Sequence, residues 1–380
     1  MADGYARATG KVGVAYVISG PGLCNIMTPM GQAYSDSVPM LVLSSVLDET
    51  EAKRGQLHQM KDQEGAAATV CDWSVTARTA EASYQLIDRA LMQMETDVPS
   101  PKHIQVPIAL LEARADPAHP RPADWPTCPE AAPLQCSTLT ERLRAAKRPL
   151  FIFGGGATRG VARWWPHFQR MNAASFTTYA GRGIIPDDSP LHFGATLASA
   201  SSAEVIASAD LVVAVGTRLS EVDLWRDHLG HKAPMIRIDL DHESLTDRHG
   251  AEVRICADAG AHLTESLMQI EDVKDTSWAK KEVADQRARW HAELDAERPG
   301  ILPVADALRA VIPASTMIYS DMTQFAYAAK ETYPMDRPRH WHHPYGFGTL
   351  GYALPAAIGG KIGVGDQPVL AILGDYGFQY

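Results

Sequence analysis

The sequence predicts an α/β fold made of three consecutive doubly wound parallel-sheet domains. The main observation is that apolar runs end in glycine-rich turns at residues 12–22, 149–156 and 369–377. The second is that segments of helical character alternate with such runs along the chain. Strand, glycine turn and helix in alternation are typical of parallel sheets whose faces are covered by helices.

The first domain is expected over residues 1–115. Its expected elements are strands at residues 12–18, 39–46 and 101–108 and helices at residues 25–34 and 83–94. The loop at residues 48–61 follows the second strand and contains both acidic and basic residues. Its polar side chains include Arg54, Gln56, His58 and Gln59. Loops at the carboxyl ends of parallel strands line ligand crevices, so this loop is a candidate site wall; a solvated surface loop is the equal alternative.

A proline-rich stretch separates the first domain from the second. Prolines crowd between residues 112 and 133, which predicts a stiff linker at residues 116–138. The middle domain is expected over residues 139–273, with strands at residues 149–153, 209–215 and 235–240. Its glycine turns lack the GxGxxG fingerprint, so a Rossmann-like scaffold without a ligand is favoured over a dinucleotide site.

The third domain is expected over residues 301–380, after a charged bridging helix at residues 274–300. It contains a helix at residues 303–311 and a strand at residues 317–320, with Asp321 at the end of that strand. The apolar run at residues 369–373 predicts a buried parallel strand. The turn Gly374-Asp375-Tyr376-Gly377 then places backbone N–H groups and one carboxylate where a metal-bound phosphate would sit.

Both ends of the chain predict an incomplete molecule. A parallel strand and its turn need a following helix to cover the sheet, and residues 369–377 lead almost directly to the last residue. Residues 4–10 have the pattern of a helix already in progress, closed by Gly10. We therefore expect the first and last domains to be truncated.

Composition excludes several classes of function. The formal charge is −10 over 380 residues, and no block of Lys and Arg gives the footprint of a nucleic-acid binder. No apolar run approaches the ~18 residues of a membrane span. The five cysteines are far apart and odd in number, and no signal peptide precedes them. These features predict a soluble cytoplasmic protein that acts on small molecules.

The order of the motifs resembles the thiamine-diphosphate enzymes of the acetolactate synthase type. The motifs are residues 2–10 (ADGYARATG), the turn Ser19-Gly20-Pro21-Gly22 with Asn25, residues 36–40 (DSVPM), residues 147–149 with 154–156, residues 181–183 with Pro186, residues 238–241 (IDLD), residues 348–359 (GTLGYALPAAIG) and the Gly374-Asp375 turn. They cover nearly the whole chain. The resemblance implies a pyrimidine-binding first domain, a Rossmann-like middle domain and a diphosphate-binding third domain.

The resemblance also implies the cofactors and the partner. Thiamine diphosphate and Mg²⁺ would lie between the first domain of one subunit and the third domain of another, which implies a homodimer or a tetramer. FAD could bind in the middle domain, as in acetolactate synthases, but is not expected here. The cofactor's thiazolium ylid would add to the carbonyl of a 2-oxo acid, and CO₂ would leave to give an enamine.

The resemblance assigns roles to individual residues. Asp375 matches the aspartate that ligates Mg²⁺. Leu350 matches the apolar residue that holds the cofactor bent, with plain core packing as the alternative. His58 matches the polar residue that faces the substrate. The expected cofactor-binding residues are Ser19, Gly20, Pro21, Gly22, Asn25, Gln324, Gly348, Thr349, Leu350, Gly374, Tyr376 and Gly377.

Two parts of the family's catalytic set would fall outside the sequence. The glutamate that activates the cofactor would precede Met1, and a metal-ligating asparagine would follow Tyr380. We therefore expect residues 1–380 alone to bind cofactor poorly and to show no turnover, as an incomplete chain or as a non-catalytic subunit.

Departures from the synthase pattern suggest a particular branch. Tyr376 replaces a glycine of the phosphate turn, so either the turn differs or Gly377 takes over the close approach to the ligand. His342 and His343 replace small residues; they could transfer protons as catalytic residues beside His58, or lie exposed at a domain seam.

These departures, with residues 23–25 and 54–58, resemble the branch of 5-guanidino-2-oxopentanoate decarboxylases. The predicted function is non-oxidative decarboxylation of a 2-oxo acid, possible substrates including that compound. The alternative is an acetolactate synthase-type carboligase acting on pyruvate. A cationic substrate would need a carboxylate such as Asp48, Glu49 or Asp62, although each could equally be a surface charge.

Overall fold

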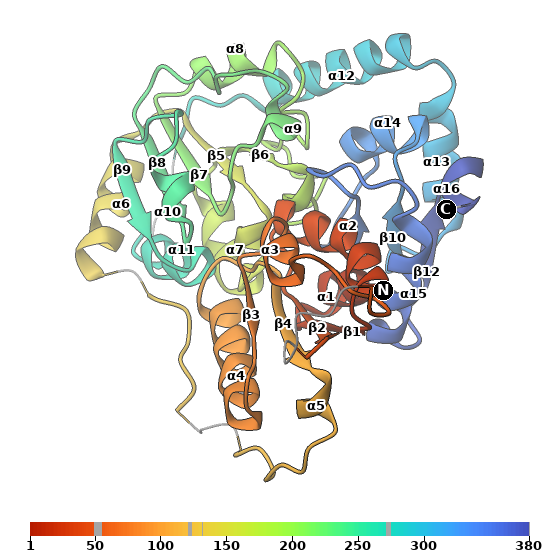
Figure 1. The fold of residues 1–380 in the computed structure, drawn as a ribbon. Coiled ribbons are helices and arrows are strands. Elements are labelled where there is room, and N and C mark those ends of the chain that lie inside the picture. Colours follow the sequence, from red (N-terminus) through yellow and green to blue (C-terminus); the bar gives the residue numbers. More distant parts are fainter. Residues whose placement is uncertain (49–54, 121–123, 131, 271–274, 380) are drawn as a thin grey trace. The chain divides into compact units, whose positions relative to one another are not determined.

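The computed structural model describes residues 1–48, 55–120, 124–130, 132–270 and 275–379 (Figure 1). The chain divides into two compact units. The first contains residues 1–127, 319–322 and 343–380, and the second contains residues 128–318 and 323–342. Three parallel sheets carry the fold, which confirms the α/β class. None of the described helices combines the length and the apolar character needed to cross a membrane.

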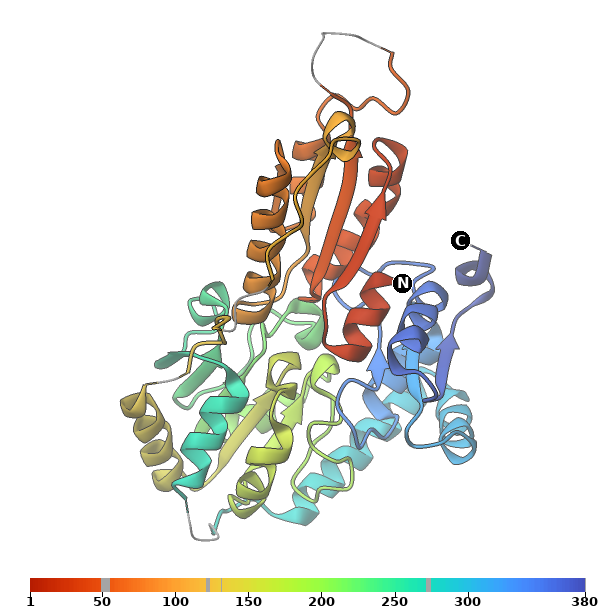
Figure 2. The ribbon, with the colours of Figure 1, turned by 90° about the horizontal axis from the view of Figure 1, so that it is seen from below.

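The first sheet lies in the first unit and has the strand order β1-β2-β4-β3. Its strands are β1 (Gly13–Val17), β2 (Met40–Val46), β3 (Trp73–Thr76) and β4 (Lys102–Pro107). The associated helices are α1 (Ala2–Thr9), α2 (Pro21–Ser35), α3 (Gln63–Ala68), α4 (Ala80–Thr96) and α5 (Ile108–Leu111). Figure 2 shows α4 running along the strands.

The central strand β2 is buried on both faces. Met40 and Val42 pack with residues of α1 and α2, whereas Leu41 packs with Ala90 of α4 and Ile104 of β4. Successive side chains of a strand point to opposite faces, so a strand covered on both sides is a continuous apolar run. Because β1 and β2 pair in parallel, their carboxyl ends and the turns that follow them lie at one edge of the sheet.

The second sheet lies in the second unit and has the order β6-β5-β7-β8-β9. Its strands are β5 (Pro149–Phe153), β6 (Ala174–Thr177), β7 (Leu211–Val215), β8 (Met235–Asp239) and β9 (Val253–Cys256). The helices around it are α6 (Pro133–Ala145), α7 (Val161–Arg170), α8 (Ser202–Ala207), α9 (Glu221–Leu224), α10 (His242–Leu245), α11 (Ala259–Met268) and α12 (Lys280–Glu297), with short 3₁₀ turns at Gly155–Thr158 and Tyr179–Gly181.

Two apolar cores cover the faces of this second sheet. Phe151 and Phe153 of β5 pack with residues of α6, α7 and α11, whereas Leu150 and Ile152 pack with residues of α8, α9 and α12. The helix α6 begins at Pro133, inside the stretch that the prolines marked as a linker. Proline is accommodated in the first turn of a helix, where its missing N–H is not needed.

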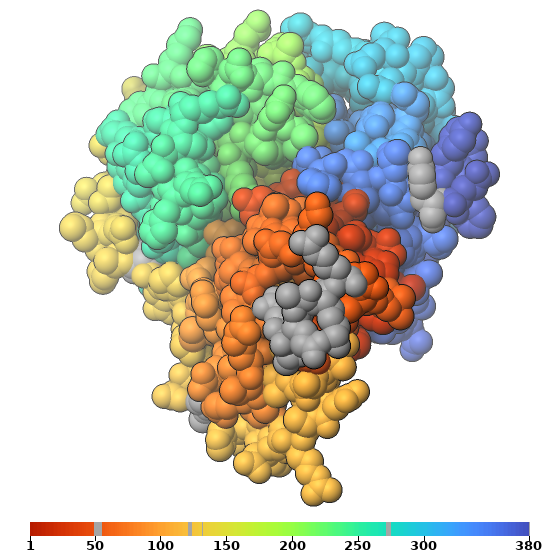
Figure 3. Space-filling model, in the orientation of Figure 1, coloured from red at the N-terminus to blue at the C-terminus, as the bar shows by residue number. Residues whose placement is uncertain are grey.

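The third sheet has the order β11-β10-β12. Its strands are β10 (Met317–Ser320), β11 (Trp341–His342) and β12 (Val369–Ile372), and the neighbouring helices are α13 (Ile301–Val311), α14 (Gln324–Thr332), α15 (Ala353–Val364) and α16 (Asp375–Gln379). Within the first unit α15 packs closely on α1, because a Cβ on Gly4 would lie 2.0 Å from the carbonyl oxygen of Ala356. Figure 3 shows the last described residues, in dark blue, at the surface.

Candidate functional site

The turn after β1 is held by polar side chains. The Ser19 N–H donates to Ser45 Oγ at 3.0 Å, and the Gly20 N–H donates to Gln63 Oε1 at 2.9 Å. Gly20 has φ +62°, and a Cβ there would lie 2.4 Å from the His58 carbonyl oxygen. Only glycine fits this position without strain. The fold therefore brings the backbone of His58 against the turn, although the two are far apart in the sequence.

Gln63 is a functional candidate that sequence reasoning missed. Its side-chain nitrogen donates to the Ser45 carbonyl at 2.8 Å and to Gln105 Oε1 at 3.1 Å, while its oxygen accepts from Gly20. A buried amide with all these partners fixes the turn in one orientation. The only sequence signal is Asp62, which precedes Gln63 and caps α3 by accepting a hydrogen bond from Gly65.

A buried histidine lies in the same polar network. The two ring nitrogens of His103 are each 2.7 Å from a serine hydroxyl, Ser44 on one side and Ser74 on the other. Burial lowers the pKa of His103 to about 4, against the opposing effect of Glu64. The imidazole is therefore neutral near pH 7 and acts as a hydrogen-bonding link between strands.

His103 should make folding stability depend on pH. The folded pKa lies below the ordinary value of 6.5, so the unfolded chain takes up the proton first as the pH falls. The contribution of neutral His103 to the free energy of unfolding is complete above about pH 6.5. It declines toward pH 4 by about 1.4 kcal/mol per pH unit. Between about pH 7.5 and pH 5 the free energy of unfolding should fall in both proteins. We expect this fall to be about 2 kcal/mol smaller in His103→Gln than in the wild type, measured by urea unfolding.

Two other buried histidines provide the internal reference for this measurement. Burial also lowers the pKa values of His192 and His262 to about 4. Their contribution is common to the wild type and the His103→Gln variant, so it cancels in the comparison. Equal losses of unfolding free energy in the two proteins would show that His103 is not the source of the slope.

A second candidate segment is the loop before α15. Gly348 and Gly351 both have positive φ values, +66° and +71°. The Thr349 N–H donates to Gln32 Oε1 at 3.3 Å, and the Gly351 N–H donates to Asp321 Oδ2 at 2.9 Å. Leu350 stands between these anchored residues and is 57% exposed. Packing in the core of this chain does not explain the position of Leu350, because its side chain is exposed.

Asp321 joins this loop to the turn after β12. The residue is 2% exposed, and its N–H donates to the Ile372 carbonyl at 2.8 Å. A Cβ on Gly377 would lie 2.6 Å from Asp321 Oδ2, the same oxygen that accepts from Gly351. Tyr376 is 74% exposed, and Gly377 is the residue of the turn that lies close to Asp321. The sequence placed Asp321 at a strand end without assigning it to the site.

Two polar groups near these segments fit a diphosphate and its cation. Asp375 opens α16 with an exposed carboxylate that no other described residue engages. Thr349 Oγ1 is buried and has no hydrogen-bond partner among the described residues. Mg²⁺ is commonly bound through one or two carboxylates plus phosphate oxygens. In the described part of the chain no cluster of three or more metal-ligating side chains offers a closed site instead.

The remaining predicted residues have varied surroundings. Pro21 and Gly22 form the first turn of α2, Asn25 is exposed on that helix, and Gly374 precedes α16. Gln324 is exposed at the start of α14, where its side-chain oxygen accepts a hydrogen bond from Arg298.

The paired histidines are buried, so the hypothesis that they are exposed is wrong. His343 is 1% exposed, and its Nδ1 lies 3.0 Å from Ser320 Oγ. His342 is buried in β11. Enclosed imidazoles that contact the protein favour a packing role over proton transfer to a substrate.

The acidic candidates for a cationic substrate are used locally. Asp48 accepts a hydrogen bond from the Ala109 N–H at 3.2 Å, and Asp62 caps α3. These contacts favour structural roles for both. Glu49, like Arg54 of the same loop, lies outside the described residues.

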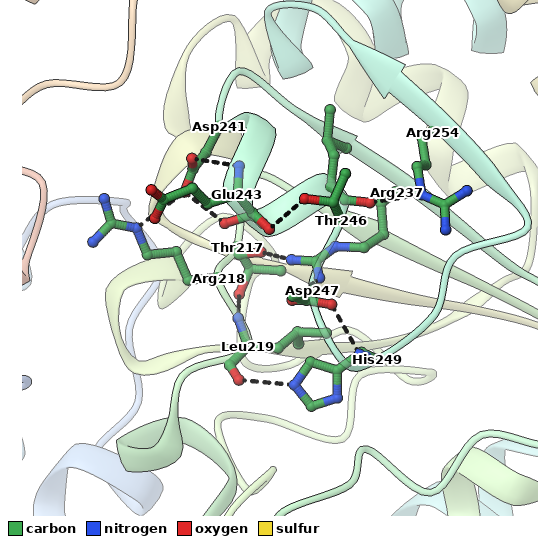
Figure 4. Close-up of polar contacts among 12 residues, drawn as sticks. Thr217, Arg218, Leu219, Arg237, Asp241, Glu243, Thr246, Asp247, His249 and Arg254 are labelled. Atoms are coloured by element: carbon green, nitrogen blue, oxygen red, sulfur yellow. Dashed lines mark hydrogen bonds and ion pairs between the residues drawn. The ribbon is translucent and has the colours of Figure 1, made fainter.

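The strand ends of the middle domain form a polar cluster of their own (Figure 4). Arg237 is buried in β8, donates to the Thr217 carbonyl and pairs with Asp247. Asp241 caps α10 and lies 3.4 Å from the Arg218 guanidinium. These groups are engaged with one another, as in a structural cluster. This geometry favours a scaffold role for the middle domain.

Comparison with known proteins decides the family. Residues 1–66 match the N-terminal TPP-binding domain of thiamine pyrophosphate enzymes, residues 136–266 match their central domain, and residues 321–380 match their C-terminal TPP-binding domain. A protein of Pseudomonas aeruginosa named probable 2-ketoarginine decarboxylase is 40% identical over 393 residues, covering 100% of this chain and 69% of that protein. The chain belongs to the acetolactate synthase-like thiamine-diphosphate enzymes.

Other members of this thiamine-diphosphate enzyme family are more distant. The large subunit of acetolactate synthase isozyme 3 of Escherichia coli is 29% identical, with 100% of this chain and 69% of that protein covered. Sulfoacetaldehyde acetyltransferase of Alcaligenes xylosoxydans is 28% identical, with 99% and 68% covered. The matching domains indicate thiamine diphosphate as the cofactor of this enzyme. The presented Leu350, the unpartnered Thr349 hydroxyl and the exposed Asp375 carboxylate are consistent with it.

Proposed function

We propose that this thiamine-diphosphate enzyme decarboxylates 5-guanidino-2-oxopentanoate, which is 2-ketoarginine. The observation that carries the proposal is the 40% identity over the whole chain to a probable 2-ketoarginine decarboxylase. The identity to an acetolactate synthase over a similar length is 29%. A pyruvate carboligase and a non-catalytic subunit are the alternatives that the experiment must exclude.

The chain's own residues would bind and orient the cofactor. Thiamine diphosphate supplies the electron sink that allows a 2-oxo acid to lose CO₂. Asp375 would hold Mg²⁺ on the diphosphate, and Leu350 would support the thiazolium ring. The turn at Ser19 and Gly20 would lie beside the pyrimidine ring, and His58 would face the substrate. Gln63 and Asp321 would keep these segments in place without touching the reacting atoms.

The test measures CO₂ release and carboligation separately. The full-length protein is supplied with thiamine diphosphate, Mg²⁺ and either 2-ketoarginine or pyruvate. We expect CO₂ and the decarboxylated aldehyde from 2-ketoarginine, and little turnover of pyruvate. Formation of acetolactate from pyruvate alone would overturn the assignment in favour of a carboligase, and flavin absorbance in the purified protein would support that outcome. No turnover of either compound by cofactor-loaded protein would support a non-catalytic role.

We further propose that the partner is a second copy of the chain, in a dimer or a tetramer. Large apolar side chains on the first unit are exposed in a single chain: Val14, Tyr16 and Ile18 on and just after β1, and Leu350 and Tyr376 in the third domain. Exposed apolar groups of this kind mark interaction surfaces. Light scattering of the full-length protein with cofactor and Mg²⁺ should give at least a dimer, and a monomer at micromolar concentration would contradict the proposal.

A further inference from the structure

Asp36 is a buried carboxylate that receives donors from two distant parts of the chain. It follows α2, and its side chain is 6% exposed. Its Oδ2 accepts from Arg7 Nη2 at 2.8 Å and from Gln32 Nε2 at 2.7 Å. The N–H groups of Tyr345 and Gly346 donate to the same carboxylate at 3.3 and 3.0 Å. Asp36 thus links the first domain by hydrogen bonds to the start of the loop at residues 345–351, which carries Leu350.

The Asp36 carboxylate is paired with a guanidinium in a buried setting. Burial raises the pKa of Asp36 above its ordinary value, and the Arg7 guanidinium opposes that effect. Arg7 also donates to Asp3 at 2.8 Å and lies 5.5 Å from the centre of the Tyr352 ring. Removing the Asp36 charge would weaken this buried pairing and both backbone hydrogen bonds together.

A second residue of α2 makes a parallel link. The Gln32 side chain donates to Asp36 through its nitrogen and accepts the Thr349 N–H through its oxygen. The loop also packs tightly here, because a Cβ on Gly346 would lie 2.0 Å from Ser35 Oγ and one on Gly31 would lie 2.6 Å from the Phe347 ring. Residues 345–349 therefore pack against the carboxyl-terminal half of α2.

We propose that Asp36 is a positioning residue for the cofactor, which sets the loop at residues 345–351 and through it the side chain of Leu350. This inference rests on the proposed function of Leu350 as the support of the thiazolium ring. It also gives a role to two family motifs, residues 2–10 and 36–40, because Asp3, Arg7 and Asp36 come from them. Asp36 itself does not touch the cofactor in this proposal.

The test compares Asp36→Asn with a matched control. Asp247→Asn makes the same chemical change at another aspartate–arginine pair, in the middle domain, where the arginine is buried and the aspartate side chain is 23% exposed. Affinity for thiamine diphosphate with Mg²⁺ is measured by tryptophan fluorescence, and amide hydrogen exchange is followed in peptides covering residues 343–352. We expect Asp36→Asn to weaken affinity at least about tenfold and to speed exchange in those peptides. Asp247→Asn should leave both within about twofold, even if it lowers stability.

A kinetic readout separates positioning from general damage. Because Asp36 acts on the loop and not on the reacting atoms, saturating cofactor should restore most of the kcat of Asp36→Asn, while the cofactor concentration for half-activity stays raised. Gln32→Leu, which removes the parallel link to Thr349, should shift cofactor affinity in the same direction and serves as the second variant if Asp36→Asn fails to fold.

Three outcomes distinguish the inference from the proposed function. Failure of the wild type to bind thiamine diphosphate would remove the proposed function itself. Normal cofactor affinity in a folded Asp36→Asn or Gln32→Leu protein would remove only the positioning role. An equal loss of affinity in Asp247→Asn would show that the effect is one of stability, and would overturn the inference as well.

Discussion

Replacing Asp375 by asparagine in the full-length protein should reduce turnover by at least about a hundredfold, because Asp375 is the proposed ligand of Mg²⁺ and carries the one carboxylate of the turn Gly374-Asp375-Tyr376-Gly377. An amide keeps the shape but loses the charge that attracts Mg²⁺. We expect the concentration of Mg²⁺ required for cofactor binding to rise, measured by titrating the metal at fixed thiamine diphosphate and following tryptophan fluorescence.

Asp366→Asn is the matched control for this experiment. Asp366 is an exposed aspartate between α15 and β12 in the same domain, and no described contact gives it a part in the site. The control should bind metal and cofactor as the wild type does. An unchanged Mg²⁺ requirement in Asp375→Asn would remove Asp375 from the metal site.

The second large effect is expected at Gly20. Alanine there meets two costs, because φ is +62° and its Cβ would lie 2.4 Å from the His58 carbonyl oxygen. The ψ of Gly20 is −108°, and this sparsely populated combination of φ and ψ alone costs about 1–3 kcal/mol for a residue with a Cβ. We expect Gly20→Ala to lower the free energy of unfolding by about 3 kcal/mol or more and to weaken cofactor binding as the turn moves.

Gly55→Ala separates these two costs. Gly55 has φ +75°, but a Cβ there would meet no described residue within 4 Å. Its replacement should show only the conformational cost, about 1–2 kcal/mol, with normal cofactor affinity. Urea unfolding and cofactor titration of both variants make the comparison. Equal losses of stability would mean that the approach of His58 to Gly20 is not a real constraint.

The long apolar strands and the glycine turns were predictable because their signals are local. The runs at residues 12–18, 149–153 and 369–373 correspond to β1, β5 and β12, and Gly10 ends α1 at φ 70°. The expectation that the last of these strands is buried is wrong, because β12 is half-buried. The strand β3 was not predicted. It is short and only half-buried, and two of its four residues are serine and threonine, so it lacks the continuous apolar pattern of a central strand.

The contacts that organise the candidate site could not be predicted from the sequence. Gln63 lies 43 residues from Gly20, and Asp36 lies 310 residues from Gly346. Such partners leave no periodic pattern in the sequence. Motif order located the turns and Leu350, but it gave no role to Gln63, Asp321 or Asp36. The hydrogen bonds of the folded chain identify residues that hold a site although the motif pattern assigns them no role.

Leu350 stands on a loop whose conformational entropy is lost when the protein folds. The backbone N–H groups of Tyr345, Gly346, Thr349 and Gly351 are already held by side chains from other elements. Ordering a mobile residue during binding costs roughly 1–2 kcal/mol. A ring that packs on Leu350 does not have to order this loop during binding. Less of the free energy of the apolar contact is then offset by the loss of conformational entropy.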